Sequence, residues 1–167
     1  MSELQSDSTL LNATDGLSAA GPSATQRVVY VMEVADRPGI MHAIAAVFAH
    51  RGLSMQALVA DAHRTPPRIL VVFDGTPRQC RLVEQVLARL HDVHRIRSLA
   101  ADAPEVRAFA VCHDKGGAAL PELIGVSAQQ LGDTWLLSGS YVAVDAALAQ
   151  LRAADRIDEV SRSLVAL

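Results

Sequence analysis

The fold follows from one stretch of the sequence, Asp36-Arg37-Pro38-Gly39-Ile40-Met41. A β-branched, apolar segment at 28–34 precedes it and predicts a strand. Behind it, apolar residues recur at the spacing of one helix face, at Ile40, Ile44, Val47 and Phe48. Asp36 stands where a helix N-cap is expected, Pro38 suits the first helical turn, and Gly52 predicts the helix end. The stretch is therefore predicted to form a tight turn between a strand and a helix.

Two interpretations of this turn remain open. In one, Asp36 only caps the helix and Gly39 only relieves crowding. In the other, the free amides and the dipole of the helix N-terminus attract the carboxylate of a small ligand, while Asp36 receives its ammonium group. Ile40, Met41 and Leu53 would then supply an apolar rim for an aliphatic side chain. A free amino acid carries all three of these groups.

The rest of the chain predicts two similar α+β modules. The first has the order βαββαβ, which packs as an antiparallel sheet with both helices on one face. Its remaining elements are predicted at 53–63, 68–73, 77–90 and 93–99. After Pro104 the same order returns, with a short first helix, at 106–112, 118–124, 126–131, 134–138, 142–152 and 157–165. The fold class is therefore tandem ferredoxin-like modules, with strand 53–63 at a free sheet edge that a second copy could pair with across a two-fold axis.

Short matching segments support the prediction that the two halves of the chain are related. The triplet Asp74-Gly75-Thr76 precedes the second predicted helix, and Ser138-Gly139-Ser140 precedes the last one. The similarity also extends into the helices that follow, where Leu87-Ala88-Arg89-Leu90 corresponds to Leu148-Ala149-Gln150-Leu151.

Composition excludes several classes of partner. The chain has 167 residues, half of them apolar and 4% aromatic, with a net charge of −3. Without a basic block or stacking aromatics, nucleic acid and membrane are not expected as partners. Cys80 and Cys112 make no disulfide or metal spacing and suit a reducing compartment. Residues 1–26 lack the features of a secretory signal or transit peptide and are expected to form a flexible tail, so the expected location is the cytoplasm.

Catalysis has little support in the sequence. His91 and His94 are three residues apart, but no third metal ligand follows at a suitable spacing. The context of the histidines suggests no Ser-His-Asp or Cys-His arrangement, and Gly116-Gly117 opens no phosphate-binding signature. We therefore expect no catalytic residue and no metal ligand, although a small metal enzyme remains a third alternative.

Two segments resemble a known family. The stretch at 36–41 with Val47-Phe48-Ala49-His50-Arg51-Gly52-Leu53-Ser54-Met55 is similar to the signature of an ACT domain. Thr134-Trp135-Leu136-Leu137-Ser138-Gly139, then a helix and residues 156–163, is similar to the C-terminal segment of the regulatory small subunit of acetolactate synthase (acetohydroxy-acid synthase). The resemblance covers residues 27–167. It implies an ACT domain at 27–102 and a shorter C-terminal ACT-like domain at 103–167.

The resemblance also implies a function. Members of this family are not catalysts; they bind and activate a separate catalytic subunit and confer feedback inhibition by valine or another branched-chain amino acid. Thiamine diphosphate, Mg and FAD would then be expected only in the catalytic partner, with no cofactor in this chain. The alternative is a stand-alone tandem ACT sensor of amino acids with a different partner.

The expected effector site lies at the ACT–ACT interface of a homodimer. The resemblance assigns to it Asp36, Pro38, Gly39, Ile40, Met41, Leu53 and Ser54. The family commonly has Asn where Asp36 and Ser54 stand. Losing one polar contact to a charged ligand costs on the order of 1.5–3 kcal/mol, or roughly 10- to 150-fold in affinity. Weaker valine binding, or a different effector, is therefore expected.

Overall fold

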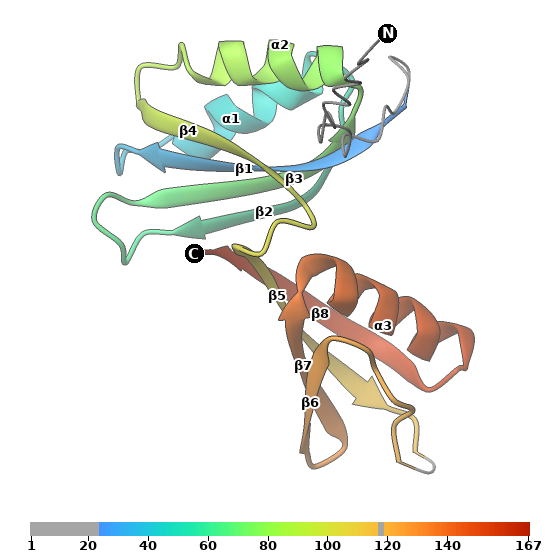
Figure 1. Cartoon of the computed structure of the whole chain (residues 1–167). Helices are drawn as coiled ribbons and strands as arrows, with labels where there is room; N and C mark the ends of the chain where they lie inside the picture. The colour runs from blue at the N-terminus through green and yellow to red at the C-terminus, as the bar shows by residue number, and fades with distance from the viewer. Residues whose placement is uncertain (1–23, 117–118) are drawn as a thin grey trace, which may run out of the picture.

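The computed structural model describes residues 24–116 and 119–167, which form two modules, one above the other in Figure 1. The first module comprises β1 (Gln26–Val34), α1 (Ile40–Ala49), β2 (Met55–Asp61), β3 (Arg68–Gly75), α2 (Pro77–Leu87) and β4 (Val93–Ala100). The second module comprises β5 (Val106–Asp114), β6 (Val126–Leu131), β7 (Thr134–Ser140), α3 (Tyr141–Ala153) and β8 (Ile157–Ala166).

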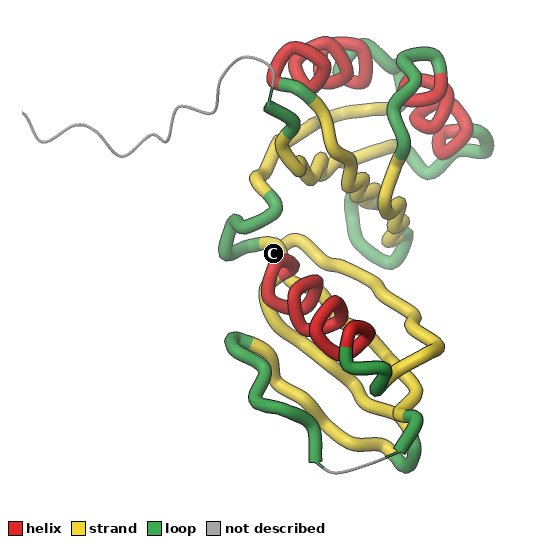
Figure 2. The backbone as a smooth tube through the Cα atoms, turned by 90° about the vertical axis from the view of Figure 1, so that its right-hand side faces the viewer, coloured by secondary structure: helices red, strands yellow, loops and turns green. Residues whose placement is uncertain are grey.

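Each module holds a four-stranded antiparallel sheet, so the α+β, tandem ferredoxin-like fold is confirmed. The strand orders are β2-β3-β1-β4 and β6-β7-β5-β8. In the first module both helices lie on the same face of the sheet, as predicted (Figures 1 and 2). The strand predicted at 53–63 is shorter, β2, and lies at a sheet edge as expected.

The second module departs from the predicted order. A short helix was expected at 118–124, but the described residues 119–125 contain none, and the element order is βββαβ. Residues 115–125 connect β5 to β6, whereas residues 35–54 connect β1 to β2. The shorter connection also contains Pro121 and two glycines with positive φ, Gly116 and Gly125, which disfavour a continuous helix.

The sheet of the first module is buried on both faces. Alternate residues of its central strands, such as Tyr30 and Val71, pack against α1 and α2. The intervening residues Val29, Leu70 and Val72 belong to the apolar cluster that contains the core of the second module. Figure 2 shows the same layering, with helices above the first sheet and the second module below it.

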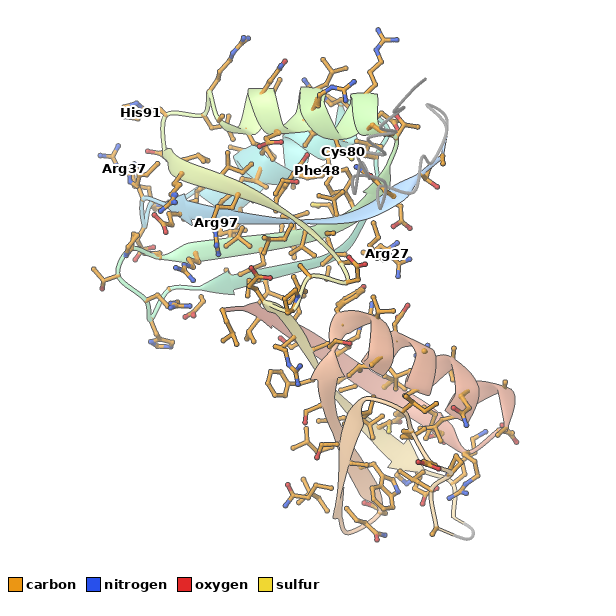
Figure 3. The ribbon with its side chains drawn as sticks, in the orientation of Figure 1. Arg27, Arg37, Phe48, Cys80, His91 and Arg97 are labelled. Carbon is orange, nitrogen blue, oxygen red and sulfur yellow. The ribbon has the colours of Figure 1, made fainter. Side chains whose placement is uncertain are left out.

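A polar contact also joins the modules. The Arg27 guanidinium donates to Asp74 on β3 at 2.9 Å and to Asp145 on α3 at 3.1 Å. Arg162 on β8 donates to the other oxygen of Asp145. The Asp74 hydrogen bond raises the pKa of Arg27, so the arginine stays charged. Arg27 is labelled at this junction in Figure 3.

The predicted tail falls almost wholly outside the described residues, and β1 already begins at Gln26. Cys80 and Cys112 are buried and form no disulfide. None of the helices in the described chain has the length and hydropathy needed to span a membrane.

Candidate functional site

A cavity of about 390 Å³ lies at one end of the first module, where the turn between β1 and α1 meets the hairpin between β2 and β3. This hairpin approaches the turn because Val34 donates its amide to the Pro67 carbonyl at 3.0 Å. The lining is Val34 to His42 on one side and Ala60, Ala62 and 67–69 on the other. Arg37 marks this end of the module in Figure 3.

The start of α1 differs from the prediction. Its N-cap is Gly39, not Asp36, and Pro38 lies before the helix and not in its first turn. Gly39 has φ +93°, a backbone conformation that other residues adopt only with strain, and a Cβ there would meet nothing within 4 Å. Glycine is therefore required here by conformation and not by space.

This cap leaves the helix N-terminus open to a ligand. Gly39 has no side chain, and in the described part of the chain no side chain accepts a capping hydrogen bond from the first turn of α1. The amide of Ile40 donates only a long hydrogen bond, of 3.4 Å, to the Arg37 carbonyl. An unfilled helix N-terminus favours an anion, because its amides and dipole both point outward.

The position of the turn is fixed by the packing of α1. Phe48 is fully buried, and its ring meets Phe73 of β3 edge-on, with centroids 5.0 Å apart. Tyr30 also contacts Phe73 and donates its hydroxyl to the Cys80 carbonyl at 2.6 Å, and burial raises its pKa. Phe48 and Cys80 lie between the helices and the sheet in Figure 3. At the far end Gly52, with φ +62°, ends the helix as predicted.

The charged groups around the cavity point in different directions. Arg37 is 64% exposed and lies 3.8 Å from Asp92. Arg68 contributes to the lining, but its guanidinium lies 3.7 Å from Glu33, its cross-strand neighbour, on the sheet face away from the helices. The rest of the lining is largely apolar, and Asp36 and His42 are its other titratable residues.

Five of the seven residues predicted for the site line this cavity: Asp36, Pro38, Gly39, Ile40 and Met41. Leu53 and Ser54 do not. They lie beyond the other end of α1, about 15 Å away along a ten-residue helix, and Leu53 packs against the module core.

Sequence reasoning missed the lining from the hairpin, namely Ala60, Ala62, Pro67 and Ile69. Small and apolar residues carry no chemical signature. Their role depends on the register of β2 with β3, which places Ala60 opposite Ile69. Only the predicted order βαββαβ could have indicated that this hairpin returns to the turn.

The histidines were the candidate metal ligands of the sequence. Across residues 24–116 and 119–167, no group of three His, Cys, Asp or Glu side chains is placed to hold a metal ion. His91 and His94 flank the start of β4, and both are solvent-accessible.

The fold has a known counterpart among solved structures. The crystal structure of the small subunit of acetolactate synthase from Thermotoga maritima matches with a TM-score of 0.61 and 19% identity, over 86% of this chain and 96% of that chain. The regulatory subunit of aspartate kinase from Thermus thermophilus, in its ligand-free form, matches with a TM-score of 0.40 and 15% identity, over 79% of this chain and 97% of that one. No protein-family model and no curated protein matches. At 19% identity, the first likeness shows a shared fold.

Proposed function

We propose that this chain is a non-catalytic regulatory subunit that binds a small amino acid at the cavity beside α1 and modulates a catalytic partner. The observation that carries the proposal is the cavity itself, which combines an uncapped helix N-terminus, a carboxylate and an apolar lining. The fold shared with an acetolactate synthase small subunit, together with the resemblance of both sequence segments, supports that enzyme's catalytic subunit as the partner.

The cavity suits each part of an aliphatic amino acid. The first-turn amides of α1 would receive the carboxylate, and Asp36 would receive the ammonium group. Ile40, Met41 and Ile69 offer the apolar surface for a branched side chain. Valine or another branched-chain amino acid is therefore the proposed effector.

A homodimer would complete this site. Among the described residues no strand pairs with the outer edge of β2, which has no charged residue before Asp61, whereas the opposite edge, β4, carries His94, Arg95 and Arg97. Cationic residues on an edge strand oppose pairing with another copy, so β2 is the edge suited to it.

Pairing of β2 with β2 about a two-fold axis is antiparallel. The start of β2 in one copy then lies beside the end of β2 in the other, where Ala60 and Ala62 line the cavity. Leu53 and Ser54 of the second copy would thereby approach the Asp36 turn of the first. This arrangement accounts for the distance between the two parts of the predicted site within one chain.

Regulation then follows from linkage. An effector that binds one arrangement of the dimer more tightly than another shifts the equilibrium between the two arrangements. The activity of the partner enzyme can change only by that difference in binding free energy. In this proposal, the catalytic partner supplies thiamine diphosphate, Mg and FAD, and both proteins act in the cytoplasm.

The direct test is acetolactate formation by a catalytic subunit from the same organism, titrated with this protein with and without valine. Stimulation that valine reverses would support both the partner and the effector. Stimulation insensitive to valine would keep the partner and refute valine as the effector. No stimulation at any ratio would refute the partner, and valine binding in that case would favour a stand-alone sensor.

The cavity has its own test in Gly39→Asp. A carboxylate at this position would repel the carboxylate of the ligand, so isothermal titration should show no valine binding at concentrations that saturate the original protein. Gly132→Asp is the matched control, because Gly132 also has positive φ (+67°) and open space around its Cβ position, but lies far from the cavity in the β6–β7 turn. Equal valine binding by both variants would refute the site.

A further inference from the structure

The second module has a sheet face that the described chain leaves uncovered. Its other face packs against α3 through Ala108, Ala110 and Cys112, all buried (Figures 1 and 2). The intervening residues of β5 point away from α3, and there Phe109 and Val111 are both 42% exposed. In the first module the corresponding sheet face is covered by the second module.

The centre of this uncovered face contains no charge. Phe109 lies opposite Ser138 and Ser163 on the neighbouring strands, and Val111 lies opposite Leu136 and Ser161. A sheet face adapted to water usually carries charged or long polar side chains at such positions. A centre of apolar and small neutral residues is instead typical of the core of a protein–protein interface.

Charges of opposite sign occupy the two ends of the face. Arg107, exposed, precedes Phe109 at one end of β5. At the other end the face is hollowed by a cavity of about 450 Å³, whose charged or titratable lining residues are Asp133, Glu159 and His113. His113 lies 3.5 Å from Asp133 and 3.0 Å from Asp158, so carboxylates outnumber the histidine and the hollow stays acidic. The face is therefore complementary to itself, because turning it by 180° brings its cationic end to the acidic hollow.

We propose that a second copy of this chain stacks on this face, sheet against sheet, about a two-fold axis that reverses the strand direction. Phe109 and Val111 of the two copies form the centre of the contact. Arg107 of each copy enters the acidic hollow of the other, beside Asp133 and Glu159. This interface is distinct from pairing at the β2 edge and does not depend on any effector.

The size of the face sets the strength of the contact. Four strands spaced about 4.8 Å apart, each about six residues long, give a sheet face of roughly 400 Å² per copy. Two such faces bury about 800 Å², below the roughly 1,200 Å² of stable complexes, so this contact alone is expected to be weak and concentration-dependent. In an assembly already held at another interface, it would form more readily because the second contact is intramolecular.

Sedimentation velocity on the full chain, from about 1 µM to about 500 µM, tests the proposal at concentrations where weak contacts form. Val111→Arg places a charge at the centre and should raise the dissociation constant of the concentration-dependent step at least about tenfold. Leu82→Lys is the matched control, since Leu82 is also an exposed apolar residue, 46% exposed, but lies on α2. Identical sedimentation of all three proteins would overturn the proposal.

Charge reversal distinguishes a second copy from any other occupant. Arg107→Glu and Glu159→Arg should each weaken self-association, whereas an equimolar mixture of the two variants should restore it, because each face then meets its complement. Failure of the mixture to associate better than either variant would overturn the two-fold arrangement. If residues 1–23 or a different protein covered the face, none of these variants would change the self-association of the purified protein in sedimentation velocity. That outcome also refutes a second copy.

Discussion

Replacing Gly139 with alanine should test whether the end of the connection between β5 and β6, at Gly125, lies directly against β7. An alanine Cβ at this position would sit 2.6 Å from the carbonyl oxygen of Gly125 in the preceding connection. Carbon–oxygen contacts are normally about 3.3 Å or longer, so backbone must move by about 0.7 Å. The cause of instability would be this collision, since Gly139 has no positive φ.

The magnitude follows from two opposing terms. Overpacking against backbone costs about 2–3 kcal/mol, near the upper end of the usual range. Alanine also lowers the conformational entropy of the unfolded chain, which stabilises the variant by about 0.4–1 kcal/mol. We therefore expect Gly139→Ala to lower the free energy of unfolding by about 1–2.5 kcal/mol, and to lower the melting temperature by roughly 2–4 °C per kcal/mol.

Gly75, which precedes the N-cap of α2 as Gly139 precedes that of α3, is the matched control. A Cβ there would meet Phe73 Cε2 at 3.0 Å and Cys80 Sγ at 3.3 Å, and these side-chain atoms can move more easily than backbone. Gly75→Ala should therefore cost only about 0–1 kcal/mol. Urea unfolding followed by circular dichroism measures both variants. If Gly139→Ala is no less stable than Gly75→Ala, the connection does not lie against β7.

Three further outcomes are expected. Thr76→Ala removes the N-cap of α2 and its capping box and should cost about 0.5–2 kcal/mol in urea unfolding. The hydrogen bond to Asp158 raises the pKa of His113. The contribution of His113 to stability is therefore complete below its unfolded-state pKa and is lost as pH rises through its folded-state pKa. His113→Gln should remove this pH dependence from urea unfolding midpoints measured across that range. A double-mutant cycle on Arg27→Gln and Asp145→Asn should give a coupling free energy of about 0.5–1 kcal/mol, reduced by solvent because both side chains are more than one-third exposed.

Each of these outcomes can fail in a specific way. Equal stability of the original protein and Thr76→Ala would show that the capping box contributes nothing measurable. A midpoint that rises with pH in the original protein but not in His113→Gln would reverse the predicted sign. Additive effects in the double-mutant cycle would mean that the ion pair between β1 and α3 does not couple the modules in solution.

The first module could be predicted closely because its local signals agree. The apolar stripe of α1, the apolar strand at β3 and the Pro-containing start of α2 each match the element that the tertiary structure requires. The cap of α1 was mispredicted because Asp36 is the better capping residue by type. The chain instead uses the freedom of Gly39 to turn into the helix three residues later.

The second module was predicted less well, because the described residues 119–125 form no helix. The connection from β5 to β6 is short, and neither its length nor the positive φ of Gly116 and Gly125 could be read from the apolar pattern that predicted a helix there. The candidate site shows the same limit. Its contiguous half, the Asp36 turn, is visible in the sequence. Ala60 and Pro67 come from a hairpin whose position depends on strand pairing, and Leu53 and Ser54 could join them only through a second copy.

The two-faced burial of the first sheet has a consequence for dissecting the protein. A fragment ending after β4 would keep every hydrogen bond of its sheet and still expose Val29, Val31, Leu70 and Val72 together, on the face that the second module now covers. Such a fragment would be prone to aggregate, and its behaviour should not be taken as that of the first module within the whole chain. Replacing these four residues with polar ones would be needed before this half of the chain could be transplanted into another protein.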